Sequence, residues 1–165
     1  IARRFNHLYG DTLPEIANVL SDIPVMIGLD GRKMSKSYDN AIYIADSDDE
    51  TAKKIMSAYT DPKKIRKDDP GHPEGCAVFS LHSVYNRENA DNVEKECRAG
   101  ARGCVSCKRE CIESVITHLA PMRERRAELV KDPGQVFRVL EQGADRARAV
   151  AGETMADVRK SMGLL

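Results

Sequence analysis

Apolar residues recur every three or four positions through most of the second half of this chain. One set is Ile112, Val115, Ile116, Leu119 and Met122, which Leu129 and Val130 extend beyond an expected kink at Pro121. Two more sets are Val136, Val139, Leu140, Ala144 and Ala147, and Met155, Val158 and Met162. This spacing places apolar side chains on one face of a helix, and Asp132-Pro133 is typical of a helix start. The pattern therefore predicts a mainly α-helical chain with these faces buried in its core.

Composition agrees with a helical chain and limits the other possibilities. Aromatic residues make up 5% of the 165 residues and Trp is absent, which favours helices over a β-sandwich. Lys and Arg number 26, as do Asp and Glu, so the net charge is zero. No run of 18 apolar residues and no signal-peptide pattern is present, and we expect a cytoplasmic location. Because the chain begins at Ile1 rather than Met, we also expect a fragment.

The sequence pattern of the first half predicts a mixture of short elements rather than long helices. A helix is expected from Ile1 to Tyr9, and the apolar run Val25–Leu29 indicates a buried strand. Ser47 and Glu50 have the spacing of a capping box, and the helix that they begin is expected to end at Asp61-Pro62. Residues 61–75 are rich in turn formers and predict a linker.

The most specific local motif is Lys33-Met34-Ser35-Lys36-Ser37. It follows the expected strand and the turn pair Asp30-Gly31. Lysine is a compact charge on a flexible stem, so two lysines three residues apart with hydroxyls beside them suit the oxygens of a triphosphate. The pentapeptide therefore predicts an ATP-binding loop at residues 33–37, with Lys33 and Lys36 as the catalytic cations.

This pentapeptide resembles the second signature loop of class I aminoacyl-tRNA synthetases. The surrounding sequence is similar to the bacterial tryptophanyl-tRNA synthetase family along nearly the whole chain. The matching segments are Arg4-Phe5-Asn6, Tyr9-Gly10, Gly28-Leu29-Asp30-Gly31, Lys33 to Ser37, Asn40, Thr60-Asp61-Pro62, Leu119 to Arg125, and Met162-Gly163-Leu164.

The resemblance implies a domain order and an activity. Residues 1–45 would end a Rossmann-like catalytic domain, residues 46–75 would connect, and residues 76–165 would form an α-helical anticodon-binding domain. The implied activity is ATP- and Mg²⁺-dependent activation of tryptophan and its transfer to tRNA(Trp). The resemblance also implies that the full-length protein is a homodimer and that it has no membrane partner. The first class I signature, which begins with a histidine, is missing, so we expect the chain alone to be inactive.

Five cysteines fall between Cys76 and Cys111, an odd number that argues against a disulfide framework. Cys104 and Cys107 form a chelating pair, and with Cys76 and Cys97 they offer four thiolates that suit zinc or an iron–sulfur cluster. Spacing alone favours zinc. Some members of the resembled family carry a [4Fe–4S] cluster on a similar spacing, with a first interval two residues longer, so the resemblance favours that cluster. We interpret Cys111 as a packing thiol.

Local charge leaves further alternatives open. Residues 97–131 contain eight basic residues (Arg98, Arg102, Lys108, Arg109, Arg123, Arg125, Arg126 and Lys131) and four acids (Glu110, Glu113, Glu124 and Glu128). This excess of four suits either a phosphate-facing surface or a solvated helix face. Three other functions stay possible: a metal-stapled RNA-binding module without catalysis, a tyrosine-specific relative, and a zinc-dependent protein-interaction domain. The phosphate loop favours the tryptophan-specific enzyme.

Overall fold

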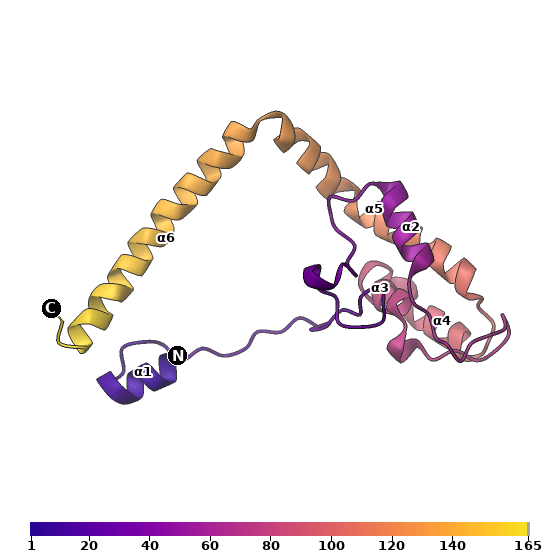
Figure 1. Cartoon of the computed structure of the whole chain (residues 1–165), viewed down its shortest axis with the longest axis horizontal. Helices are drawn as coiled ribbons and strands as arrows, with labels where there is room; N and C mark the ends of the chain where they lie inside the picture. Colours follow the sequence, from indigo (N-terminus) through magenta and orange to yellow (C-terminus); the bar gives the residue numbers. More distant parts are fainter. Residues whose placement is uncertain (165) are drawn as a thin grey trace. The chain divides into compact units, whose positions relative to one another are not determined.

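The computed structural model describes residues 1–164 and is mainly helical, as the sequence predicts (Figure 1). Its α-helices are α1 (Ala2–Tyr9), α2 (Asp48–Ser57), α3 (Ala77–Tyr85), α4 (Arg87–Arg98), α5 (Cys104–Lys131) and α6 (Pro133–Ser161). Two 3₁₀ helices are η1 (Lys36–Tyr38) and η2 (Pro73–Gly75). Among these residues, none of the helices combines the length and apolar character that crossing a membrane requires.

The chain divides into two compact units, each described here by itself. The larger unit comprises residues 21–126, and the smaller one combines residues 1–20 with the described residues from 127 onward. This division into two compact units does not test the three domains expected at 1–45, 46–75 and 76–165, so that assignment stays a prediction.

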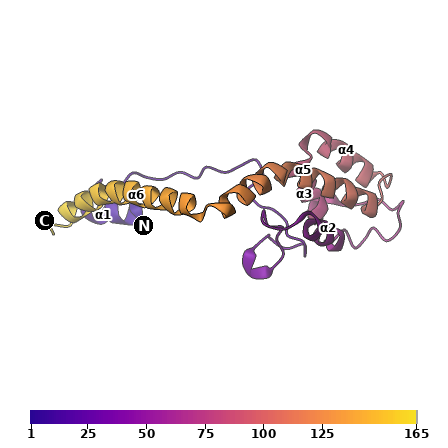
Figure 2. The same cartoon turned by 90° about the horizontal axis from the view of Figure 1, so that it is seen from above.

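The larger unit has one apolar core, formed where α2, α3 and α5 meet. Its buried members are Ile55, Ala58, Ala77, Val78, Leu81, Cys111, Val115 and Leu119. Helices α3, α4 and α5 lie side by side in both views (Figures 1 and 2). The predicted apolar stripe of α5 is therefore right for Val115 and Leu119, and Cys111 packs among them as expected. The predicted burial is wrong further along α5, where Met122 and Val130 are exposed.

The smaller unit contains α1 and the long helix α6, and no residue of α6 is buried. Thr12 Oγ1 lies 2.6 Å from Ser161 Oγ, which joins the segment after α1 to the end of α6. The expected burial of the α6 stripe is wrong here: Val139 and Leu140 are about 60% exposed. An amphipathic pattern marks a face suited to burial, but among the described residues nothing covers this one.

The strand expected at Val25–Leu29 is also wrong. Among residues 1–164 its only β pairing is one antiparallel bridge between Ile27 and Lys33. Backbone groups of this segment instead bond to the residues that follow it: Leu29 N–H donates to Asn40 O at 2.8 Å, and Tyr59 N–H donates to Leu29 O at 2.7 Å. A strand needs a neighbouring strand to pair with, and here the segment pairs with loops.

The capping box is confirmed, but the helix after it is shorter than expected. Ser47 Oγ accepts from Glu50 N–H at 3.2 Å, and Glu50 Oε2 accepts from Ser47 N–H at 2.7 Å. Helix α2 ends at Ser57, before Asp61-Pro62. The following segment packs more tightly than a linker: Gly71 N–H donates to Cys97 O at 2.9 Å and Pro73 is buried.

Candidate functional site

The loop of residues 33–37 is a tight turn with a defined backbone. Gly28 N–H donates to Arg32 O at 2.6 Å, and Met34 N–H donates to Met26 O at 2.9 Å. Ser35 caps the short helix η1 by accepting from Ser37 N–H at 3.3 Å, and the two hydroxyl oxygens lie 2.8 Å apart. The apolar segment before the motif therefore fixes where the motif begins.

Asn40 is buried and hydrogen-bonds to two backbone groups of this loop. It is 3% exposed; its Nδ2 donates to Asp30 Oδ1 at 2.7 Å and to Lys33 O at 3.2 Å, and its Oδ1 accepts from Ser35 N–H at 2.8 Å. A Cβ at Gly28 would lie 2.3 Å from Asn40 Nδ2, so only glycine leaves room for this amide. The Asn40 hydrogen bond, with others from Arg32, lowers the pKa of Asp30 to about 2.

Both predicted catalytic lysines are exposed on this fixed backbone. Among residues 1–164, neither Lys33 nor Lys36 has a carboxylate within ion-pair distance, whereas Arg32 pairs with Asp30 and Lys54 with Asp46. Arg32 also stacks over the Tyr38 ring at 4.3 Å. The loop thus carries two exposed ammonium groups that have no carboxylate partner among residues 1–164.

The four predicted metal-ligating cysteines line one small cavity. Cys76 precedes α3, Cys97 lies near the end of α4, and Cys104 and Cys107 occupy the first turn of α5. The cavity has a volume of about 30 Å³ and its other lining residues include Val78, Phe79, Val93 and Arg102. The helices therefore bring together thiols that lie up to 31 residues apart in the sequence (positions 76 and 107).

The donor chemistry of this cavity suits a thiophilic metal. Burial raises the pKa values of the Cys76, Cys97 and Cys107 thiols, that of Cys107 to about 12, and their mutual repulsion as thiolates adds to the effect. A cation among them would favour the thiolates. Among the described residues, however, no group of three or more His, Cys, Asp or Glu side chains is arranged to hold an ion. The thiols share a cavity but would have to reorient to coordinate a metal.

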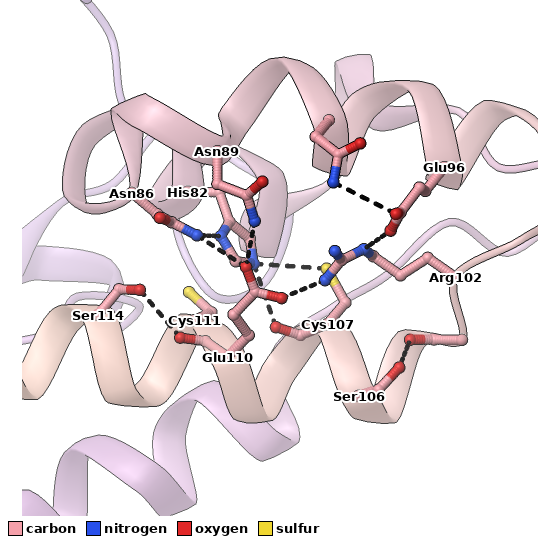
Figure 3. Close-up of polar contacts among 12 residues, drawn as sticks. His82, Asn86, Asn89, Glu96, Arg102, Ser106, Cys107, Glu110, Cys111 and Ser114 are labelled. Carbon is pink, nitrogen blue, oxygen red and sulfur yellow. Dashed lines mark hydrogen bonds and ion pairs between the residues drawn. The ribbon is translucent and has the colours of Figure 1, made fainter.

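A buried polar network, which the sequence did not reveal, adjoins this cavity (Figure 3). His82 is completely buried; its Nδ1 lies 3.1 Å from Asn86 Nδ2, and its Nε2 lies 3.1 Å from Cys107 O and 3.5 Å from Cys107 Sγ. Because an amide NH₂ can only donate, Nδ1 accepts and Nε2 carries the proton. Burial lowers the pKa of His82, which agrees with a neutral ring.

Glu110 and Arg102 complete the network. Glu110 Oε1 accepts from Asn86 Nδ2 at 3.0 Å and from Asn89 Nδ2 at 2.6 Å, and its other oxygen pairs with Arg102. Arg102 Nε also donates to Glu96 Oε2 at 2.7 Å. This arginine links α4, α5 and the cavity wall, a role that sequence spacing could not show.

Other basic side chains close to the cysteines in sequence have partners outside the cavity. Arg98 pairs with Glu74 and Glu94, while Lys108 Nζ donates to the Met56 and Ala58 carbonyl oxygens at 2.8 Å. Arg123 likewise fastens α5 to α2, pairing with Asp48 and donating to Thr51 Oγ1 at 2.7 Å.

These features agree with the comparison against known families. The family model described as tRNA synthetases class I (W and Y) matches residues 1–120. The chain therefore belongs to this family of class I aminoacyl-tRNA synthetases.

Several relatives with high similarity carry the name of the tryptophan-specific enzyme. The chain is 47% identical over 166 residues to "Tryptophan--tRNA ligase" of Aquifex aeolicus, covering 99% of this chain and 42% of that protein. It is 40% identical over 167 residues to the protein of that name from Thermotoga maritima, covering 51% of it. A solved tryptophanyl-tRNA synthetase from Campylobacter jejuni, complexed with ADP and tryptophan, matches 99% of this chain and 51% of its own, with 31% identity and a TM-score of 0.72. The chain thus spans about half the length of these relatives.

Proposed function

We propose that this chain supplies the phosphate-binding loop and the RNA-facing helical region of a tryptophan–tRNA ligase. The observation that carries this proposal is the pair of exposed, unpaired lysines on the loop that Asn40 fixes, in a member of the tryptophanyl and tyrosyl synthetase family. The names of the relatives support tryptophan over tyrosine as the amino acid.

The proposed reaction begins with tryptophan and Mg²⁺-bound ATP. A carboxylate oxygen of tryptophan attacks the α-phosphorus, and the bond from that phosphorus to the bridging oxygen breaks. Pyrophosphate leaves with the electron pair, and tryptophanyl-adenylate remains. A ribose hydroxyl at the 3′ end of tRNA(Trp) then attacks the carbonyl carbon, AMP leaves with the electron pair of the acyl–phosphate bond, and the hydroxyl proton passes to solvent. The attacking carboxylate is already ionised, so this step needs no general base.

Lys33 and Lys36 would stabilise the negative charge that develops on the departing pyrophosphate. Stabilisation that is stronger in the transition state than in bound ATP raises the rate rather than the affinity. Their long stems can follow moving phosphate oxygens, while the backbone of the loop stays in place through Asn40. The hydroxyls of Ser35 and Ser37 stand beside them as further donors.

The test is Lys36→Ala in the intact enzyme that contains this chain. We expect the rate of adenylate formation, followed by ATP–pyrophosphate exchange, to fall about 100- to 1,000-fold. The dissociation constant for ATP should change far less. Lys53→Ala, which removes another exposed lysine, serves as the matched control. Equal losses of rate and ATP affinity would show that Lys36 contributes ground-state binding only.

We infer in addition that Cys76, Cys97, Cys104 and Cys107 hold a metal–sulfur group, which the family resemblance suggests is a [4Fe–4S] cluster. Such a group would supply a structural cross-link between the starts of α3 and α5 and the end of α4. A second candidate is a single zinc ion, for which four cysteine thiolates are a common ligand set; the small volume of the cavity, about 30 Å³, suits one ion better than a cluster.

Elemental analysis of the anaerobically purified chain separates these candidates. A cluster predicts a brown protein with iron and acid-labile sulfide, and zinc predicts a colourless one. Cys97→Ser should abolish metal retention, whereas Cys111→Ser, at a buried thiol outside the cavity lining, should keep it. Retention of metal by Cys97→Ser, or its absence from the unaltered chain, would refute the site.

A further inference from the structure

A second and larger cavity lies on the other side of Cys104 and is strongly basic. Its volume is about 520 Å³. Among the described residues that line it, the charged ones are Lys64, Arg66, Lys67 and Arg109, and none is Asp or Glu. We name this cavity the basic pocket. One wall comes from the turns after α2 and the other from the start of α5.

The two arginines of the basic pocket differ from most arginines of this chain. Arg98, Arg102 and Arg123 each pair with carboxylates. Among the described residues, by contrast, the exposed side chains of Arg66 and Arg109 have no ion-pair or hydrogen-bond partner. Like charges gathered in one place repel one another, and an anionic ligand would relieve that repulsion.

The pocket walls are held in place before any ligand binds. The Asp61 side chain accepts from Lys63 N–H at 2.9 Å and from His72 N–H at 2.8 Å, and Asp69 Oδ2 accepts from Arg66 N–H at 2.6 Å. Gly100, at φ 71°, lets Asp68 O approach so closely that a Cβ there would lie 2.2 Å from it. This contact docks the turn segment against the loop that leads into α5.

Exposed apolar residues beside these cations limit which class of ligand suits the basic pocket. Ile65 is 87% exposed and Val105 is 54% exposed, and both line the pocket. A free phosphate ion would make no use of them. A nucleotide in a single-stranded segment brings both a phosphate and an apolar base face, and single-stranded segments are the parts of RNA in which bases are accessible.

We propose that the basic pocket binds single-stranded RNA, with Arg66, Lys67 and Arg109 on backbone phosphates and Ile65 and Val105 against a base. The inference rests on the proposed function for the identity of the RNA, tRNA(Trp). It concerns a place on the chain separate from the phosphate loop at residues 33–37.

The expected magnitude follows from counterion release. Each phosphate contact to single-stranded nucleic acid contributes about 0.7 to the slope of log affinity against log salt, which is about fivefold in affinity at 0.1 M salt. Removing three contacts should therefore weaken binding about 100-fold and lower the slope by about two.

The experiment measures fluorescence anisotropy of a labelled tRNA(Trp) transcript, and of its anticodon stem-loop, titrated with the chain. The test variant combines Arg66→Gln, Lys67→Gln and Arg109→Gln. A control with the same loss of charge combines Lys53→Gln, Lys95→Gln and Arg146→Gln, all exposed and outside the pocket lining. The control should lose less than about threefold. A charge-preserving variant, Lys67→Arg with Arg109→Lys, should bind nearly as well as the unaltered chain.

Three outcomes would overturn the inference. The first is a test variant whose RNA affinity and salt slope match those of the control. The second is a test variant that loses bound metal but keeps RNA affinity, which would assign these cations to offsetting thiolate charge. The third is binding to phosphatidylserine vesicles in preference to RNA. If the unaltered chain bound no tRNA(Trp) at all, the RNA part of the proposed function would fail as well, whereas failure of the pocket variant alone would leave that function standing.

Discussion

Asn40 provides the sharpest test of how the phosphate loop is held, through the substitution Asn40→Ala. The buried side chain bonds to two backbone groups of the loop, Lys33 O and Ser35 N–H. Each such hydrogen bond contributes about 1 kcal/mol net, so the loop should lose about 2 kcal/mol of local stability. Because 1.4 kcal/mol is a factor of ten, local opening should become about 30-fold more frequent.

Amide hydrogen exchange reads this opening directly. The Met34 amide bonds to Met26 O and has no bond to Asn40, so its protection reports on the loop as a whole. It should fall about 30-fold in Asn40→Ala, while the Val115 amide in the core of α5 should be unaffected. Asn92→Ala, which removes an exposed asparagine on α4, is the control. If only the Ser35 amide exchanged faster, Asn40 would merely shield one group and the argument that it fixes the loop would be refuted.

Two further predictions concern Asp30 and Arg123. Asn40→Ala should raise the pKa of Asp30 from about 2 toward its ordinary value, and an NMR titration of the carboxyl carbon measures this change. The lowered pKa makes the Asp30 carboxylate contribute to stability above about pH 4, and this contribution is lost as the pH falls toward 2. In Asn40→Ala the contribution should be smaller. Arg123→Gln should destabilise the larger unit by about 1 to 2 kcal/mol in urea denaturation, because it leaves Asp48 and Thr51 without their α5 partner, whereas Arg126→Gln should have little effect. An Asp30 pKa unchanged by the first variant, or equal stabilities of the two arginine variants, would contradict these assignments.

Local signals in the sequence predicted local structure well. The capping box of Ser47 and Glu50 needs only residues three apart, and it forms. The turn at residues 33–37 is likewise local, since Ser35 caps η1 through a residue two positions away; its role in binding phosphate stays a prediction. Strand formation at Val25–Leu29 failed because pairing depends on a distant partner that a single segment cannot specify.

The sequence also did not reveal which of its residues would be buried. Histidine spacing gave no reason to place His82 at zero exposure, since its partners are Asn86, between α3 and α4, and Cys107 on α5. For α6 the error is the opposite one, because its apolar face was predicted to be buried and is exposed. Helical periodicity indicates which face is suited to burial, but it says nothing about whether another surface covers that face.

Cys104 connects the two cavities of the larger unit, because it lines both of them. A metal bound to its thiolate would fix the first turn of α5 and with it one wall of the basic pocket. The same thiolates would add negative charge beside cations that we propose meet phosphate. Salt screens charge over about 10 Å at 0.1 M but leaves rigidity unchanged. Metal loading should therefore favour RNA binding most at high salt, where the ordering of Cys104 outweighs the repulsion between thiolate and phosphate.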